Sequence, residues 1–323
     1  MSRRIAPPLA CLAAVGVLLA LLAGCGGDSG DETSRPAPSA SEFPAAKGRT
    51  LAEIAQVPES KLVVSPAGQV VDEGTNRVAF GVFDLGGEQV DDADIALYFA
   101  EGANAPARGP FPAKVESLQT PAPFRAKTTT EDPGAATSVY VVPRLEVKKP
   151  GELAMIALIR RDGKLEGTRV GSFVVGKFDD VPDIGDPAPR IHTPTADEVS
   201  DISQIETRIP PDSMHDVDYA DVLGEKPILL VFATPQFCQT RVCGPTVDIA
   251  EEVKSRIGDD AAFIHMEVFE DNEPPEVRSQ LRAFNLETEP WAFVVDRDGR
   301  IGARFEGAFG ADELTRAVEA ATD

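Results

Sequence analysis

The sequence predicts two folded domains, an all-β domain in the N-terminal half and an α/β domain in the C-terminal half. The chain has 323 residues, which is more than a single hydrophobic core ordinarily supports. Residues 51–176 contain short β-rich runs separated by Gly, Pro and Asp. From residue 201 onward, strands alternate with helices, a pattern typical of a sheet covered by helices.

The first 25 residues carry the features of an export signal. A short basic segment precedes an apolar run over residues 9–23, which is too short to span a bilayer. The segment "LAGC" at residues 22–25 resembles the lipobox of bacterial lipoproteins. The resemblance implies a signal peptide over residues 1–24, diacylation of Cys25, and a lipid anchor in the cell membrane on its extracytoplasmic face. A plain secretory signal with a chance cysteine is the alternative.

Composition narrows the partners of the mature chain. The formal net charge of −22 argues against nucleic acid as a binding partner. Acidic side chains outnumber the basic ones that would replace counterions along a phosphate backbone. Residues 25–48 are rich in Gly, Ser, Pro and Ala, and they predict a flexible tether that follows the lipid. No apolar stretch beyond the signal is long enough to span a membrane.

Residues 49–176 are predicted to form the all-β domain, for which an immunoglobulin-like sandwich is the best match. The alternation of apolar and polar residues is clear in "RVAFGVF" and "IALYF". The Pro-rich stretch at residues 102–124 predicts a long loop. The domain has no His and no Cys, so we expect a binding or spacer module rather than a catalytic one.

A Pro- and Asp-rich linker is predicted over residues 177–200, followed by the α/β domain over residues 201–323. Hydrophobic periodicity predicts its elements in the order strand, helix, strand, helix, hairpin and helix. They fall at residues 227–235, 246–258, 261–271, 274–286, 291–307 and 311–321. The first strand is a continuous apolar run, as expected for a strand buried on both faces.

Cys238 and Cys243 are the only cysteines expected to remain as thiols, because Cys11 leaves with the signal peptide and Cys25 carries lipid. Outside the cytoplasm such a pair is oxidised unless something reduces it. Pro245 fits the first turn of a helix, so the main helix is expected to begin near Gly244. Amide donors at a helix N-terminus favour a thiolate, which indicates Cys243.

Three stretches resemble the thioredoxin fold over roughly residues 185–322. They are "VFATPQFCQTRVCGP" after the first central strand, "ETEPWAFVVDRDG", and the terminal "GAFGADELTRAVEAA". The resemblance implies that Pro290 is the cis-proline facing the cysteines, with Glu289 and Trp291 beside the substrate groove. It also implies a membrane-tethered thiol–disulfide oxidoreductase that uses Cys238 and Cys243, acts on protein thiols and disulfides of the cell envelope, and needs no cofactor.

The cysteine spacing departs from thioredoxins and keeps three alternatives open. Cys-x-x-x-x-Cys matches Q-type peroxiredoxins, which implies a peroxidase in which Cys238 attacks, although Pro235 stands where those enzymes have Thr. Val231 stands where thioredoxins have a buried Asp. A Sco-like copper protein would need a third ligand, for which His265 is the candidate. The last alternative is a binding lipoprotein whose cysteines form a structural disulfide. The sequence does not decide which cysteine attacks.

Overall fold

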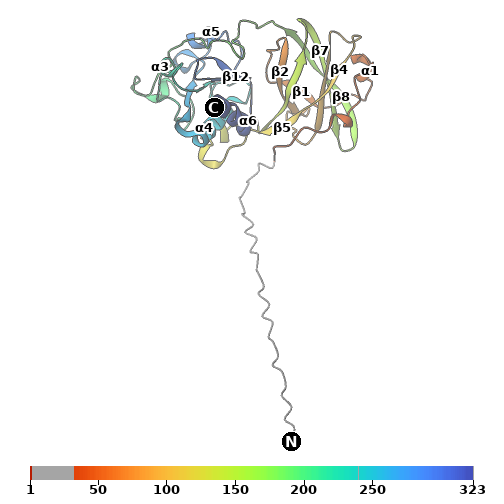
Figure 1. The fold of residues 1–323 in the computed structure, drawn as a ribbon, viewed down its shortest axis with the longest axis horizontal. Coiled ribbons are helices and arrows are strands. Elements are labelled where there is room, and N and C mark those ends of the chain that lie inside the picture. The colour runs from red at the N-terminus through yellow and green to blue at the C-terminus, as the bar shows by residue number, and fades with distance from the viewer. Residues whose placement is uncertain (2–32, 239, 323) are drawn as a thin grey trace. The chain divides into compact units, whose positions relative to one another are not determined.

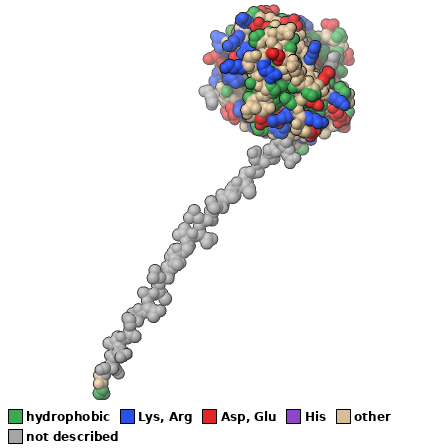
Figure 2. Space-filling view, turned by 90° about the vertical axis from the view of Figure 1, so that its right-hand side faces the viewer, with side chains coloured by type: hydrophobic (Ala, Val, Ile, Leu, Met, Phe, Trp, Pro, Cys, Tyr) green, Lys and Arg blue, Asp and Glu red, His purple; other side chains and the backbone are tan. Residues whose placement is uncertain are grey.

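The computed structural model describes Met1 and residues 33–238 and 240–322 (Figure 1). The predicted signal peptide, Cys25 and the first part of the tether lie outside the described residues. The described residues from position 33 onward belong to one compact unit, so the two-domain division stays a prediction. Within the described residues, no helix has the length and apolar character needed to cross a membrane. Acidic and basic side chains are interspersed on the face that Figure 2 shows.

The N-terminal half contains two four-stranded antiparallel sheets that face each other across a shared core. Phe80 and Tyr140 of one sheet and Leu97 of the other are fully buried in this core. The first sheet has the order β1 (Val63–Pro66), β2 (Gly74–Phe83), β6 (Ser138–Val147), β5 (Lys114–Ser117). The second has the order β4 (Arg108–Pro112), β3 (Asp94–Ala100), β7 (Gly151–Arg161), β8 (Lys164–Val175).

The outer face of the second sheet is covered by the segment that precedes the sandwich. Alternate residues of β3 face opposite ways, so that Leu97 enters the shared core while Tyr98 packs outward against Leu51 and Ile54 of α1 (Leu51–Ile54). The short helix η1 (Ala40–Glu42) leads into Phe43, which is 5% exposed. Phe43 and Ala46 are buried in the same cluster as Tyr98, and Arg35 pairs with Val115 of β5, so residues 33–48 do not form the predicted flexible tether.

The Pro-rich stretch at residues 102–124 is also more ordered than predicted. It supplies strands β4 and β5 and the turn η2 (Ala122–Phe124) rather than one long loop. Pro110 and Pro112 are accommodated because β4 is an edge strand, where a missing N–H leaves no central ladder bond broken. The short helix α2 (Lys127–Thr130) follows.

The C-terminal half is built on a four-stranded mixed sheet. Its strand order is β10 (Ala262–Met266), β9 (Ile228–Phe232), β11 (Trp291–Val295), β12 (Ile301–Glu306). Strands β9 and β10 are parallel, whereas β11 is antiparallel to both β9 and β12. A βαβ unit followed by a ββα unit in this order is the thioredoxin fold, which confirms the predicted fold of this half.

Helices cover both faces of this sheet. On one face α4 (Cys243–Ile257) and α6 (Ala311–Thr322) pack together, with Val247 and Leu314 against Leu229 of β9. On the other face α3 (Tyr219–Val222) and α5 (Ser279–Ala283) enclose Phe232 and its neighbours. β9 is thus buried on both faces, as its continuous apolar run predicts.

Two predicted segments differ from the structure. The helix predicted over residues 274–286 is reduced to α5, because Glu276 and Arg278 form backbone hydrogen bonds with Glu270 and Val268 instead of helical ones. The segment predicted as a Pro- and Asp-rich linker, residues 177–200, is packed, since Gly185 N–H donates to the Ile301 carbonyl and a short bridge pairs position 187 with position 300.

The first sheet of the sandwich packs on helices α4 and α6. Ala79 and Val139 share one apolar cluster with Val247 and Val318. Arg77 donates to both carboxylate oxygens of Glu313, at 3.0 and 2.9 Å. In this bidentate pair both side chains are 14% exposed, and the pair holds the first turn of α6 against β2.

A second polar anchor lies on α4. The buried carboxylate of Asp248 accepts the Ala126 N–H at 3.1 Å and the Arg208 Nε–H at 2.9 Å. Arg208 also donates to the Phe124 carbonyl at 2.6 Å. The segment that includes α2 is therefore held against α4. At Gly244, in the first turn of α4, a Cβ would lie 2.8 Å from Thr129 Oγ1, so only glycine allows this approach.

Candidate active site

The two cysteines lie at the junction between β9 and α4. β9 ends at Phe232, and α4 begins at Cys243 with Pro245 in its first turn. This confirms the predicted helix start, because proline at that position gives up no intrahelical hydrogen bond. The connecting loop carries Cys238, and its residue 239 lies outside the described residues.

Both cysteines are free thiols in the structure, and their sulfur atoms are close. Cys243 is fully buried, whereas Cys238 is half-buried. The two Sγ atoms and a carboxylate oxygen of Glu289 all lie within 4.8 Å of one another. Cys238 Sγ accepts the backbone N–H of Cys243 at 3.2 Å and lies 3.3 Å from Thr240 Oγ1. A small movement would bring the sulfurs to bonding distance.

Hydrogen bonds and burial separate the two thiols chemically. The hydrogen bond with the Cys243 side chain, helped by Thr240 and the backbone N–H of Cys243, lowers the pKa of Cys238 to about 6 despite its burial. Burial, together with the neighbouring Cys238, raises the pKa of Cys243 well above its ordinary value. At neutral pH Cys238 is the thiolate and Cys243 the thiol.

This corrects the helix-terminus argument for Cys243. The first backbone N–H of a helix points out of the N-terminal end, toward whichever group lies in front of that end. Here that N–H points at the sulfur of Cys238, while the Cys243 side chain turns into the core with Val247. The helix N-terminus therefore favours the thiolate of Cys238.

Glu289 brings an acidic group to the same place. The Glu289–Pro290 peptide bond is cis, as predicted. Burial, then the negative charge of Cys238 and of Glu267, raises the pKa of Glu289 to about 8. Its Oε2 is buried and has no hydrogen-bond partner among the described residues. Glu289 is thus a protonated carboxyl group beside a thiolate at neutral pH.

The sequence analysis did not identify Glu267, which lies just after β10. Glu267 is 1% exposed, and its Oε1 accepts the Thr207 N–H at 2.8 Å and the Thr207 hydroxyl at 2.7 Å. Burial raises its pKa, although His265 and Thr207 oppose this. The signal available in the sequence was a carboxylate inside the otherwise apolar run "AFIHMEVF".

Two predicted site residues lie elsewhere. Trp291 is 1% exposed and stacks on Phe293, with its indole N–H donating to Thr288, so it belongs to the core and not to an open groove. His265 does not reach the cysteines, because its Nδ1 lies 2.7 Å from Asp212 and its Nε2 donates to the Ala233 carbonyl at 3.1 Å. The copper alternative therefore loses its proposed third ligand.

A cavity adjoins the active-site loop on the side of the sandwich. Its volume is about 290 Å³. Thr240, Arg241 and Val242 form one wall, and residues of the first sandwich sheet, such as Phe83 and Val139, form the other. The Ala136 N–H donates to the Arg241 carbonyl at 2.9 Å and closes one end of the contact. The N-terminal half therefore contributes to the surroundings of the cysteines.

Among known proteins, matches to this chain were found only in the comparison with solved structures. No protein-family model matches the chain, and no curated protein matches it. A provisionally assigned thiol:disulfide interchange protein DsbE from Chlorobium tepidum matches with 17% identity and a TM-score of 0.32, covering 44% of this chain and 99% of its own. A thioredoxin family thiol:disulfide interchange protein from Chlorobium tepidum TLS has corresponding values of 18%, 0.31, 44% and 99%. A DsbF homologue from Corynebacterium diphtheriae has values of 18%, 0.30, 42% and 87%. These TM-scores are too low to establish a shared fold, so the fold assignment rests on the strand order and strand directions of the C-terminal sheet.

The lowered pKa of Cys238 can be measured by alkylation. The rate of Cys238 modification by iodoacetamide should rise with pH through a midpoint of about 6, because only the thiolate reacts. Cys243→Ala removes the side-chain hydrogen bond and should shift this midpoint upward. Cys243→Ser keeps a hydroxyl donor and should shift it less. A midpoint near the ordinary value of 9.0 in the unmodified protein would contradict the assignment.

Proposed function

We propose that this protein is a thiol–disulfide oxidoreductase in which Cys238 attacks and Cys243 resolves the mixed disulfide. The observation that carries the proposal is the hydrogen bond from the Cys243 N–H to Cys238 Sγ, with a lowered pKa on the outer sulfur and a raised one on the buried sulfur. An accessible thiolate backed by a protonated thiol is the arrangement that disulfide exchange requires.

The exchange would proceed in two balanced steps. The Cys238 thiolate attacks a substrate disulfide, forms a mixed disulfide with one half, and releases the other half as a thiolate. Cys243 then loses its proton and attacks Cys238 Sγ, which releases the second half of the substrate. The protein is oxidised to a Cys238–Cys243 disulfide, and the substrate gains two electrons. The reverse sequence oxidises a substrate dithiol.

Glu289 would move the protons in both steps. Its carboxyl group, protonated at neutral pH, can protonate the first leaving thiolate and become a carboxylate. That carboxylate can then accept the proton of Cys243, since the three side chains lie within 4.8 Å. This role would replace the buried Asp of thioredoxins, at whose place this chain has Val231, buried and apolar.

The proposal extends to the protein's surroundings. The lipobox resemblance supports a lipid anchor at Cys25, outside the described residues, in the cell membrane with the folded part on its extracytoplasmic face. Protein thiols and disulfides of the cell envelope would then be the substrates. The sandwich is proposed to be immunoglobulin-like, because the order β1-β2-β6-β5 corresponds to strands A-B-E-D and the order β3-β7-β8 to strands C-F-G.

The assignment of the two cysteines can be tested with oxidised glutathione. In Cys243→Ser we expect Cys238 to accumulate as a glutathione adduct, because no thiol remains to resolve it. In Cys238→Ser we expect no adduct, because Cys243 is buried and protonated. Intact-mass spectrometry and peptide mapping read out both variants. An adduct on Cys243 in Cys238→Ser, with none on Cys238 in Cys243→Ser, would reverse the assignment.

The peroxidase alternative can be tested with the same variants. It also uses Cys238 as the attacking sulfur, so Cys243→Ser treated with hydrogen peroxide would accumulate a sulfenic acid on Cys238. Disulfide exchange predicts that the adduct with glutathione forms much faster than this sulfenic acid. The opposite order of rates would favour the peroxidase.

The role of Glu289 predicts a kinetic defect. Glu289→Gln keeps the size of the side chain but cannot exchange a proton, so turnover of a disulfide substrate at pH 7 should fall by about 100-fold. The alkylation midpoint of Cys238 should stay acidic, since Glu289 is not among the groups that lower that pKa. Glu287→Gln, two residues away on the exposed surface, serves as the control and should turn over normally. Unchanged turnover in Glu289→Gln would remove Glu289 from the mechanism.

A further inference from the structure

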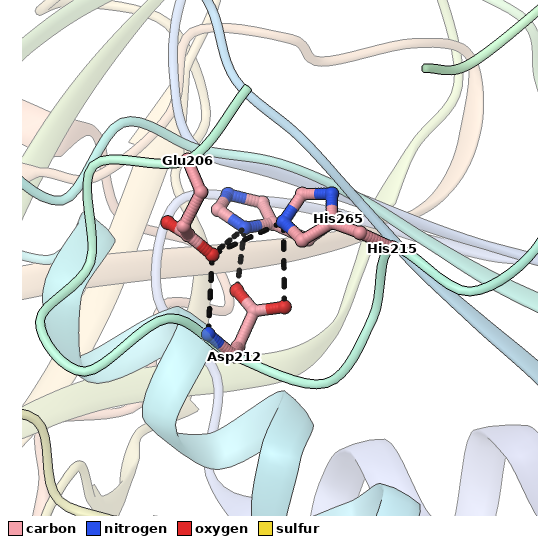
Figure 3. A group of neighbouring side chains, drawn as sticks. All are labelled: Glu206, Asp212, His215 and His265. Atoms are coloured by element: carbon pink, nitrogen blue, oxygen red, sulfur yellow. Dashed lines mark hydrogen bonds and ion pairs between the residues drawn. The ribbon is translucent and has the colours of Figure 1, made fainter. Parts of the chain in front are cut away.

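Two histidines and two carboxylates meet in the interior, away from the cysteines (Figure 3). Glu206, Asp212 and His215 come from the connection between η3 (Ile202–Gln204) and α3, and His265 comes from β10. The side chains of Glu206, Asp212 and His265 are 0% exposed, and that of His215 is 3% exposed. Figure 3 shows all four pointing toward one another. His215 lies in a linker-like segment of the sequence, for which a solvated side chain is the expectation, so its burial is a correction.

One donor atom from each of the four residues lies within 4.8 Å of the other three, close enough for a single ion to contact all of them. His215 Nε2 lies 3.1 Å from Glu206 Oε2 and 3.5 Å from Asp212 Oδ1. His265 Nδ1 lies 3.5 Å from Glu206 Oε2 and 2.7 Å from Asp212 Oδ2. A tetrahedral zinc ion with bonds of about 2.0–2.1 Å has ligand–ligand edges of about 3.3 Å. The distances of 3.1, 3.5 and 3.5 Å lie near that edge, whereas the 2.7 Å contact between His265 and Asp212 is a hydrogen-bond distance, and Asp212 faces the two histidines with different oxygens.

Backbone hydrogen bonds orient the donors. His265 Nε2–H donates to the Ala233 carbonyl, so Nδ1 is the atom that faces the carboxylates, and a bound cation would take the place of its proton. Glu206 Oε1 accepts the Arg208 N–H at 2.6 Å, so Oε2 is the oxygen directed at the histidines. Asp212 Oδ1 accepts the Met214 N–H at 2.8 Å. Metal-ligating histidines and carboxylates are typically held by such outer contacts.

The charges also suit a divalent cation. Two carboxylates buried together need positive charge nearby, because an unpaired buried charge is very unfavourable. Among the described residues, the only groups in ion-pair distance of Glu206 and Asp212 are the two imidazoles. The guanidinium of Arg208 is directed instead at Asp248 and at backbone carbonyls. A bound divalent ion that displaced the imidazole protons would balance the charge of the two carboxylates.

We propose that Glu206, Asp212, His215 and His265 form a closed, four-coordinate site for a divalent transition-metal ion, for which zinc is the best fit. Zinc accepts imidazole nitrogen and carboxylate oxygen, and a closed set of four protein ligands is typical of structural rather than catalytic sites. The site is distinct from the cysteine pair and does not depend on the proposed redox function.

The ion would stabilise the start of the active-site loop, on the side of the ligand-bearing segment. The ligand-bearing segment also contains Thr207, whose hydroxyl accepts the Gln236 N–H at 3.2 Å. His265 contacts the carbonyl of Ala233, the first residue after β9. Both contacts lie within the loop that carries Cys238. Metal binding would therefore stabilise the fold and fix the base of this loop.

Metal analysis of the purified full chain tests the proposal. After incubation with Zn²⁺ and desalting, the unmodified protein and the Cys238→Ser/Cys243→Ser double variant should each retain one zinc ion per chain. His215→Gln and Asp212→Asn should lose it. His192→Gln changes the remaining histidine, which is exposed, and should retain it. Retention in the ligand variants, or loss in the cysteine double variant, would overturn the proposal.

A second measurement does not depend on the folding of any ligand variant. Cobalt(II) bound to the cysteine double variant should give the intense visible absorption of a tetrahedral ion. In the unmodified protein the same spectrum should appear without the near-ultraviolet charge-transfer band of a thiolate ligand. Zinc should also raise the Tm of both proteins, since it binds only the folded state. No stoichiometric binding, a weak octahedral-type spectrum, or a thiolate band would each contradict the site.

Discussion

The hydrogen bond between the first N–H of α4 and the sulfur of Cys238 is the interaction on which the proposed chemistry depends. It requires a helix that begins at Cys243 and a loop that returns Cys238 to its N-terminal end. Pro245 favours the helix start at Cys243, because proline is well suited to the first turn of a helix. The end of the buried strand β9 determines where the loop that carries Cys238 begins. The five-residue spacing is thus compatible with a reactive pair, because only one of the two cysteines is helical.

Helix α4 also connects the two halves of the chain. Its first turn carries the buried cysteine and abuts α2, and Asp248 on its next turn binds the segment before α2. The sandwich also forms a wall of the cavity beside the active-site loop. An all-β half without His or Cys therefore shapes the surroundings of the thiolate without supplying a reactive group, which adds to the binding or spacer role that the sequence suggested.

Local patterns predicted the elements whose burial is set by their own sequence. β9, α4, the β11–β12 hairpin and α6 all follow from periodicity and from turn or cap residues. The prediction failed where distant segments decide: residues 33–48 pack on β3, and backbone pairing with residues 268–270 shortens α5. The sequence also could not show which cysteine is reactive, because this depends on which sulfur accepts the first N–H of α4. The histidine–carboxylate cluster joins His265 to a segment about 50 residues earlier that has no periodicity, so spacing along the chain could not reveal it.

The reduction potential of the Cys238–Cys243 pair tests the central claim most directly. It can be measured by alkylating the purified protein across a series of thiol–disulfide redox buffers. A lowered pKa on Cys238 stabilises the reduced form, so a redox-active pair is expected to have a potential between about −120 and −270 mV. A potential below about −300 mV would identify a structural disulfide and contradict the account.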